Sequence, residues 1–198
     1  MSIPHALLAL LDRGPSYGLR LKEEFEAWTG EVWPLNVGQV YKTLQRLERD
    51  GLVNADGSPS AQQRYYELAP QGREELRSWL TRCGPPSAPP RDELVIKVLM
   101  ALAVDGVDTS AVMQAHRRAL LEQLQVFTRS KADLDVSEVA AAFVVDAQIF
   151  KLEALVRWLD LCESRVGAIG EFRLPDPPSA GTRAFAEVEP MQIGRADG

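Results

Sequence analysis

Apolar residues in the first half of the chain recur every three or four positions, which is the period of an amphipathic helix. Residues 3–11 form a short apolar run that ends at a Gly-Pro breaker, and residues 17–28 form a second periodic segment. We expect Ser16 to cap this second helix. A further amphipathic segment covers residues 70–81. Its apolar side chains, which we expect to be buried, are Leu76, Trp79 and Leu80.

The segment between Trp33 and Val53 predicts a well-defined helix. Asn36 followed by Gln39 is a capping-box pair, in which the Asn side chain accepts free N–H groups of the first turn and the Gln reaches back. Gly51 suits the left-handed position that commonly follows a helix. At 3.6 residues per turn, one side of the helix is aliphatic and consists of Val37, Val40, Leu44 and Leu47. The opposite side consists of Gly38, Gln39, Lys42, Gln45, Arg46 and Arg49.

The polar side of this helix carries the residue types that bind the major groove of DNA. Gln amides pair with adenine edges, guanidinium groups pair with guanine, and Lys binds phosphate. Gly38 allows the helix to approach another molecule closely. A solvated face on an ordinary surface helix is the alternative explanation, so the interpretation depends on the neighbouring segments.

A β-hairpin is predicted directly after this helix. Leu52-Val53 and the run from Arg64 to Leu68 are β-prone, and the loop between them is rich in Gly, Pro and Ser. Three helices, a hairpin and a fourth helix therefore follow one another, which is the order of a winged helix-turn-helix. In that fold the third helix enters the major groove and the hairpin lies along the flanking backbone. We expect a mainly α-helical protein with a winged helix-turn-helix as its N-terminal domain.

The same segments resemble a known family. HALLALLDRGPSYGLRL, NVGQVYKTLQRLERDGLV and RYYELAPQGREEL are similar to the N-terminal domain of PadR-type transcriptional regulators, and they follow in family order over residues 3–82. These regulators are bacterial winged-helix proteins that mostly act as repressors. The resemblance implies that Tyr41, with Gln39 and Lys42, approaches the DNA. It also implies that Arg64 reaches a phosphate from the wing.

The wing of this chain departs from the family pattern. From Asp56 to Gln63 it contains one Asp and neither Lys nor Arg, whereas such wings are often basic. A strong contact between the wing tip and DNA is therefore in doubt, and Arg64 is left as the charged wing residue that could bind a phosphate. The DNA-binding surface that we expect comprises Tyr17, Asn36, Gly38, Gln39, Tyr41, Lys42, Gln45, Arg46 and Arg64.

The second half of the chain is predicted to be helical and separate from the first. A proline-rich segment from Gly84 to Pro90 interrupts the helical pattern and predicts a linker. Beyond it, residues 91–103, 109–129 and 136–166 have the pattern of three helices. We therefore divide the chain into a DNA-binding domain (residues 1–83), a linker (84–92), a helical dimerisation domain (93–168) and a tail that we expect to be disordered (169–198).

The last predicted helix carries two apolar stripes, although a helix on the outside of a monomer needs only one. The first stripe is a heptad seam formed by Ala142, Val145, Ile149, Leu152, Val156 and Leu159. The second, on nearly the opposite side, is formed by Phe143, Ala147, Phe150, Ala154 and Leu161, with Trp158 beside them. Because two apolar faces need two covering layers, we expect the seam to form a homodimer. The alternative is a helix at the centre of its own small bundle.

A homodimer also fits DNA binding, because a two-fold pair of recognition helices contacts a palindromic operator in double-stranded DNA. The resemblance points the same way, since longer PadR-type proteins have a helical C-terminal half through which their dimers associate. The net charge of the chain is −6, which opposes DNA binding by overall charge. DNA binding therefore requires a local cluster of cations, which a dimer doubles.

Aromatic side chains in the helical half suggest an effector site. His116, Phe127, Phe150 and Trp158 are candidates for lining a pocket that takes a small apolar or aromatic effector. A hydrogen-bonded core histidine and ordinary core aromatics are the alternative explanation for these residues. Whether an effector exists stays open at this point.

Motifs for catalysis are absent from the sequence. It contains neither G-x-S-x-G nor a phosphate-binding Gly loop, its two His lie in different halves, and its two Cys have no ligand spacing. We expect no enzymatic activity, no metal and no cofactor. No charged-then-apolar leader follows Met1, and the longest apolar runs are too short to span a bilayer, so we expect a cytoplasmic protein without a membrane partner.

The patterns together predict a dimeric, sequence-specific DNA-binding transcriptional regulator that acts as a repressor and that a small-molecule effector could release. The alternative is a winged-helix module that binds other proteins and has lost DNA binding. The acidic net charge and the cation-poor wing favour this alternative.

Overall fold

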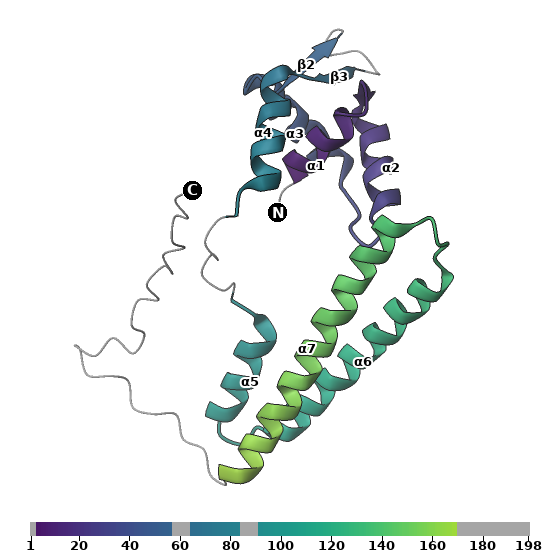
Figure 1. The fold of residues 1–198 in the computed structure, drawn as a ribbon. Coiled ribbons are helices and arrows are strands. Elements are labelled where there is room, and N and C mark those ends of the chain that lie inside the picture. The colour runs from purple at the N-terminus through teal and green to yellow at the C-terminus, as the bar shows by residue number, and fades with distance from the viewer. Residues whose placement is uncertain (1–2, 57–63, 84–90, 170–198) are drawn as a thin grey trace, which may run out of the picture. The chain divides into compact units, whose positions relative to one another are not determined.

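A computed structural model describes residues 3–56, 64–83 and 91–169 of the chain. The expected wing tip, most of the expected linker and nearly all of the expected tail lie outside these residues. The described chain is mainly helical, with one small antiparallel sheet (Figure 1). The predicted fold class is confirmed.

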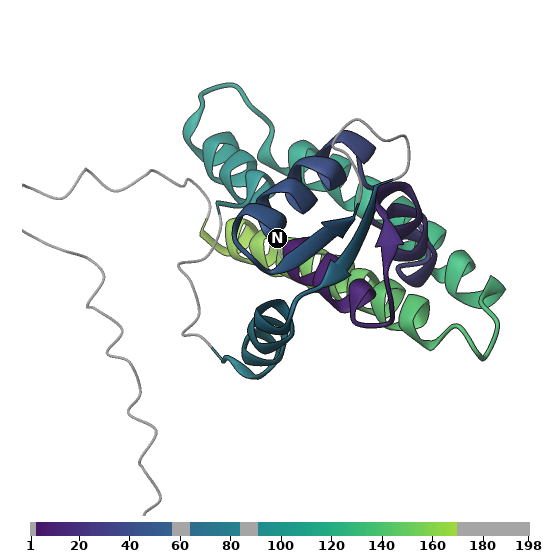
Figure 2. The ribbon, with the colours of Figure 1, turned by 90° about the horizontal axis from the view of Figure 1, so that it is seen from above.

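Four helices and three strands make up the winged helix-turn-helix part. They are α1 (Ile3–Leu11), β1 (Ser16–Tyr17), α2 (Gly18–Trp28), α3 (Val37–Arg49), β2 (Val53–Asp56), β3 (Tyr65–Leu68) and α4 (Pro70–Thr81). Strand β3 lies between the other two and pairs antiparallel with both (Figure 2). Val53 faces Leu68 across one pair, and Ser16 faces Tyr66 across the other. The wing is therefore hydrogen-bonded to the residues that lead into α2.

One hydrophobic core holds these elements together. Helix α3 contributes Val40, Leu44 and Leu47, which point away from its polar side and are buried. Burying an aliphatic side chain of this size stabilises the fold by roughly 1.5–3 kcal/mol, so the orientation of α3 about its own axis is strongly fixed. The full set of buried core residues is Leu7, Leu8, Leu10, Leu11, Leu21, Val40, Leu44, Leu47, Val53, Tyr66, Leu68 and Leu76.

Asn36 caps α3 and Gly51 follows it, as the sequence predicts, but no hydrogen bond from the Gln39 side chain back to the Asn36 backbone completes the expected capping box among the described residues. The side chain of Asn36 accepts hydrogen bonds at Oδ1 from the backbone N–H of Gly38 (2.8 Å) and of Gln39 (3.3 Å). Gly51 follows the helix with φ 73°, a left-handed conformation that residues with a Cβ rarely adopt. The prediction for Val37 is also wrong, because this residue is exposed rather than buried with the aliphatic side.

The start of α2 differs from the prediction. Ser16 does not cap this helix, since it belongs to β1 and is buried beside Tyr66. Helix α2 starts at Gly18 with Tyr17 in the capping position, and the Tyr17 side chain makes no cap hydrogen bond. Helix α4 matches its predicted span, but Leu80 is 67% exposed and does not join the core.

Three further helices follow, as predicted: α5 (Glu93–Ala103), α6 (Thr109–Asp133) and α7 (Val139–Ile169). The chain forms two compact units. The first contains Met1–Arg82 with Leu120–Val156, and the second contains Cys83–Ala119 with Arg157–Gly198. Helices α6 and α7 therefore run through both units. The domain boundaries suggested by the sequence stay predictions.

Ion pairs join α6 to α7 in each unit. In the first, Lys131 Nζ donates a hydrogen bond to Asp146 Oδ1 at 2.5 Å. In the second, Arg117 Nη2 donates to Glu163 at 2.8 Å and to Asp160 at 2.5 Å. The hydrogen bond to Glu163 is the main reason that the pKa of Arg117 lies above its ordinary value. The two helices thus lie side by side over several turns (Figure 1).

None of the helices in the described ranges combines the length and the apolar composition needed to cross a bilayer.

Replacing the residue that caps α3 is expected to destabilise the winged-helix part. Asn36→Ala removes the acceptor of two N–H groups, and loss of such a cap costs about 1 kcal/mol in the free energy of unfolding. Asn36→Asp retains an acceptor and should lie within about 0.5 kcal/mol of the wild type. Urea unfolding followed by circular dichroism measures both values. Equal losses for the two variants would contradict the capping role.

Candidate DNA-binding surface

The polar side of α3 forms an exposed surface that we call the α3 face, defined by Gly38, Lys42, Gln45, Arg46 and Arg49. All five residues are exposed, because the opposite side of the helix is fixed in the core. Within the described residues, neither Lys42 nor Arg46 forms an ion pair with a carboxylate. Their charges are therefore available to an external anion. Arg49, which is not among the predicted DNA-binding residues, forms an ion pair with the adjacent and exposed Asp50 (3.3 Å).

The two edges of α3 face different parts of the winged helix. Gln39 lies on one edge, together with Thr43, whose hydroxyl donates a hydrogen bond to the Gln39 carbonyl oxygen (2.8 Å). Tyr41 and Glu48 lie on the other edge, seven residues apart, which is nearly two helical turns. The predicted DNA-binding residues of α3 therefore divide into the exposed α3 face and its two borders.

Tyr41 packs against the first residue of α2. A Cβ atom added to Gly18 would lie only 2.6 Å from a ring carbon of Tyr41, so this approach requires glycine. Tyr41 is half-buried and packs against the hydrophobic core. The contact fixes the ring at the border of the α3 face. Its predicted approach to DNA stays a prediction.

Arg64 joins the wing to α3. Its Nη2 donates a hydrogen bond to Glu48 Oε1 at 2.6 Å, and only 15% of the Arg64 side chain is exposed. The guanidinium also lies over the ring of Tyr66, 5.6 Å from the ring centroid. Burial raises the pKa of Tyr66, so this phenol stays neutral. In this structure the guanidinium is thus engaged by a carboxylate of the same chain, which competes with the phosphate contact that the sequence suggested.

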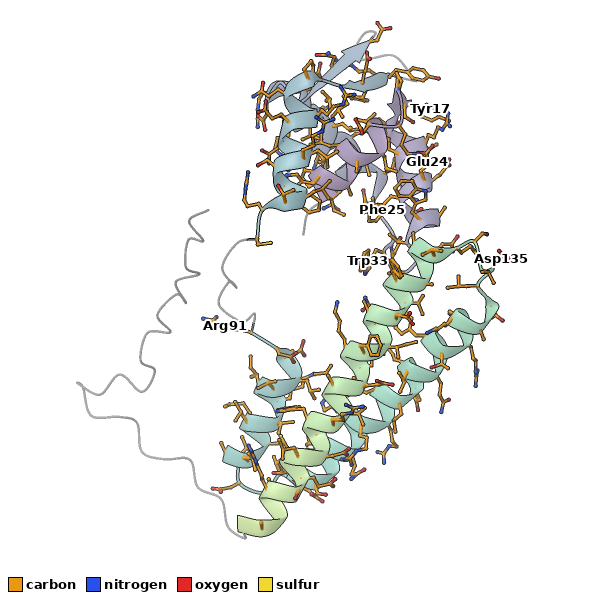
Figure 3. The ribbon with its side chains drawn as sticks, viewed as in Figure 1. Tyr17, Glu24, Phe25, Trp33, Arg91 and Asp135 are labelled. Atoms are coloured by element: carbon orange, nitrogen blue, oxygen red, sulfur yellow. The ribbon has the colours of Figure 1, made fainter. Side chains whose placement is uncertain are left out.

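Tyr17 contacts the wing through an aromatic pair. Its ring meets the ring of Tyr65 edge to face, with centroids 5.7 Å apart. Figure 3 shows Tyr17 at the end of α2 where that helix begins. Of the described wing residues, 53–56 and 64–68, only Arg64 is a cation. The wing that the structure describes therefore offers aromatic surface rather than positive charge.

The predicted dimerisation seam is largely buried inside a single chain. The exposed fractions of Val145, Leu152 and Leu159 are 1%, 8% and 0%. The other three seam residues, Ala142, Ile149 and Val156, are partly buried. Side chains that are buried within one chain offer little surface to a partner, so this burial weighs against the assignment of the seam to dimerisation, which stays a prediction. Both stripes have the same helical period, and the period alone did not show which one the chain covers itself.

The second stripe of α7 is the exposed one. Phe143 and Phe150 are 70% and 67% exposed, and Leu161 is 47% exposed. We call these three residues the α7 stripe. Large aromatic side chains that face water on the same side of a helix usually mark a surface that another molecule covers.

The four residues predicted to line an effector pocket are divided between the two compact units, and that pocket stays a prediction. His116 and Trp158 belong to the second compact unit, whereas Phe127 and Phe150 belong to the first. Phe150 is also largely exposed. An apolar cavity of about 570 Å³ lies instead in the winged-helix part, beside Phe25 and Trp33. The Trp-Pro pair at positions 33 and 34 was the only sequence signal for it.

Metal binding finds no support in the described part of the chain, where no three His, Cys, Asp or Glu side chains come together. Cys83 and Cys162 are free thiols. Burial raises the pKa of Cys162, which keeps its thiol protonated.

Two family models match the chain. The model described as "Transcriptional regulator PadR-like family" matches residues 7–78, which contain α3 and the wing. The model described as "Virulence activator alpha C-term" matches residues 90–166, which contain α5, α6 and most of α7.

Curated relatives and solved structures agree with these matches. A probable transcriptional regulator of Mycobacterium tuberculosis is 31% identical over 181 residues, which cover 81% of this chain and 95% of that protein. The negative transcriptional regulator PadR of Bacillus subtilis is 25% identical over 129 residues, covering 62% of this chain and 71% of that protein.

Crystal structures of B. subtilis PadR have the same fold. Its complex with operator DNA gives a TM-score of 0.64 at 19% identity, covering 82% of this chain and 97% of that chain. Its complex with p-coumaric acid gives a TM-score of 0.67 at 20% identity, covering 84% and 99%.

Breaking the pair between α3 and the wing is expected to cost stability. Glu48→Gln removes the charge that the part-buried Arg64 faces, and loss of a charged hydrogen bond of this kind costs about 2 kcal/mol in unfolding free energy. The exposed pair of Arg49 and Asp50 is a matched control, since Arg49→Ala should cost less than about 1 kcal/mol. Urea unfolding measures both.

A double-mutant cycle separates this pair from simple loss of packing. Combining Glu48→Gln with Arg64→Gln should recover part of the loss, with a coupling energy of at least about 1 kcal/mol. Strictly additive losses would show that Glu48 and Arg64 do not interact.

Proposed function

The chain belongs to the PadR-like family of transcriptional regulators, and on that premise we propose that it binds a palindromic operator as a homodimer and represses transcription. The negative regulator from B. subtilis, whose structure is known with operator DNA, supports repression and DNA binding. DNA recognition is assigned to residues 1–83, with the expected surface of Tyr17, Asn36, Gly38, Gln39, Tyr41, Lys42, Gln45, Arg46 and Arg64.

The observation that carries this proposal is the α3 face. Lys42 and Arg46 lie exposed on a helix whose rotation the core fixes, and neither is neutralised by a carboxylate within the described residues. Gln45 lies between them and supplies an amide that pairs with adenine. A chain with a net charge of −6 binds DNA only if its cations are concentrated in this way.

Arg64 has a supporting role in the proposal. Its bond to Glu48 holds the residue before β3 against the last turn of α3. The wing and the recognition helix then approach DNA as one surface. A phosphate contact by Arg64 requires release from Glu48, so we rank it below the contacts of Lys42 and Arg46.

Dimerisation is assigned to the α7 stripe in place of the buried seam. Phe143 and Phe150 supply large apolar side chains to an interface, and such aromatic residues dominate interface energetics. A two-fold pair places two α3 helices about 34–36 Å apart, so that they meet successive major grooves. Residues 93–168 are the proposed dimerisation domain.

Release by a small molecule is part of the proposal. The structure of B. subtilis PadR with p-coumaric acid supports an apolar or aromatic effector for this chain as well. Membership of a family of regulators supports the absence of enzymatic activity, and action on the chromosome requires a cytoplasmic location. A winged-helix module that binds proteins is the competing function, and the cation-poor described wing favours it.

Removing cations from the α3 face is expected to weaken operator binding without unfolding the protein. Arg46→Ala should cost about 1–3 kcal/mol in binding free energy. Lys42→Ala should make the slope of log affinity against log salt concentration shallower by about one unit, because the variant neutralises one phosphate fewer. Gel-shift titration against DNA selected from a random duplex pool measures both effects.

Arg77→Ala, which removes an exposed cation from α4, is the matched control and should leave the affinity unchanged. If Lys42→Ala and Arg46→Ala behave like this control, the site assignment is wrong. If the wild type binds random duplex no better at low salt, the protein-interaction module is the better explanation.

Introducing charged residues into the α7 stripe is expected to break the homodimer into monomers. The double variant Phe143→Asp with Phe150→Asp should sediment as a single chain and lose operator affinity, since one α3 helix alone contacts too few base pairs. Leu80→Asp is the control, because Leu80 is as exposed as Phe150 (67%) and lies on α4. A wild-type protein that stays monomeric at high concentration would exclude the proposed dimer.

A further inference from the structure

The apolar cavity of the winged-helix part lies directly behind the recognition helix. Its volume is about 570 Å³, and it is formed by α1, α2, the first turn of α3 and the α2–α3 connection (residues 29–36). Figure 3 shows Phe25 and Trp33 near the end of α2, away from Tyr17 at its start. The complete lining consists of Ile3, Ala6, Phe25, Val32, Trp33, Pro34, Leu35 and Gln39.

Hydrogen bonds hold the connection in the shape that leaves this cavity. The Leu35 N–H donates to Glu26 Oε1 at 2.7 Å, and Lys22 Nζ donates to Glu26 Oε2 at 2.5 Å. The bond from Lys22 is the main reason that the pKa of Glu26 lies below its ordinary value. The buried Thr29 hydroxyl bonds back to the carbonyl oxygen of Phe25 at 3.0 Å. The wall is therefore a fixed segment of chain rather than a loose loop.

The lining predicts the chemistry of a ligand. Phe25, Trp33 and Pro34 present flat apolar surfaces, which suit a planar ring. No Lys, Arg, Asp or Glu is among the lining residues, and the nearby Lys22 and Glu26 neutralise each other. A charged ligand would lose its hydration here without gaining a partner. The lining holds two side chains with hydrogen-bonding groups, the Gln39 amide and the indole N–H of Trp33, and no charged side chain, so the fitting ligand is neutral and aromatic, with one or two hydrogen-bonding groups.

Gln39 connects the cavity to the DNA-binding surface. It lies on the border of the α3 face, in the turn that Asn36 caps, and it lines the cavity as well. An amide that bonds a ligand is not free to bond an adenine edge. A molecule in the cavity thereby competes with DNA for the same side chain, with no change in the fold required.

We propose that this cavity binds a neutral aromatic small molecule and that its contact with Gln39 lowers operator affinity. The regulatory half of this inference rests on the proposed function, because it requires that the protein binds DNA. The binding half does not, since it concerns only the cavity. The site differs from the predicted pocket of His116, Phe127, Phe150 and Trp158.

Ligand binding is tested with N-phenyl-1-naphthylamine, a neutral aromatic probe with one N–H donor whose fluorescence rises in apolar surroundings. The full chain should bind it saturably. Ala6→Phe, which fills the cavity, and Trp33→Ala, which removes a wall, should each weaken binding at least tenfold. Trp28→Ala is the matched control, because Trp28 and Trp33 are almost equally exposed (44% and 43%) and Trp28 is not part of the lining.

Three results would overturn the binding site. The first is that the wild type shows no saturable binding, as expected if a second copy or another segment covers the cavity. The second is that Trp28→Ala weakens probe binding as much as Trp33→Ala does. The third is that Ala6→Phe binds the probe as well as the wild type does. Circular dichroism verifies that each variant is folded. An anionic analogue, 1-anilinonaphthalene-8-sulfonate, should bind at least tenfold more weakly, and stronger binding of this anion would contradict the assignment of a neutral ligand.

The regulatory half is tested by gel shift with and without the probe. Saturating probe should lower the operator affinity of the wild type several-fold and leave that of Ala6→Phe unchanged. Saturable binding with no effect on the gel shift overturns the regulatory half alone. Failure of the wild type to bind any DNA overturns the proposed function and the regulatory half together, and the fluorescence titration still decides the binding site.

Discussion

The burial of one side of α3 is the constraint on which the DNA-binding surface depends. Val40, Leu44 and Leu47 enter the core, so the opposite side of the helix must face solvent. Rotating the helix to hide its cations would bring these three side chains into water, at a cost of several kcal/mol. The cap at Asn36 fixes where the helix begins, and the core fixes which way it faces. Together they present Lys42 and Arg46, whose side chains form no hydrogen bond or ion pair with the described residues.

Local signals predicted most of the fold. The spans of α1, α3 and α4, the hairpin and the three later helices follow from period, caps and breakers, each of which acts within a few residues. Besides the exposure of Val37 and Leu80, the features that the sequence missed are non-local. Ser16 belongs to a two-residue strand that exists only because β3 pairs with it, and no neighbour in the sequence signals that pairing. The bond between Arg64 and Glu48 spans sixteen positions and was equally invisible.

The C-terminal helices show a second limit of pattern analysis. Two apolar stripes on α7 have the same period, and the sequence cannot tell which stripe the chain covers itself. The structure assigns the inner role to Val145, Leu152 and Leu159 and leaves Phe143 and Phe150 in water. Hydrophobicity alone would favour the reverse, because Phe is larger than Val. Packing geometry therefore decides what composition leaves undecided.

Among the residues described, the side chains of Lys42 and Arg46 form no internal hydrogen bonds or ion pairs, which has a consequence for divergence within such a family. Substitutions at these positions leave the caps, the core and the link to the wing untouched, so new operator sequences become accessible at almost no loss of folding free energy. After a gene duplication, the two copies can thus come to bind different operators through single substitutions at these positions. Gln39 is the exception, because a change there would also alter what the cavity beside it admits.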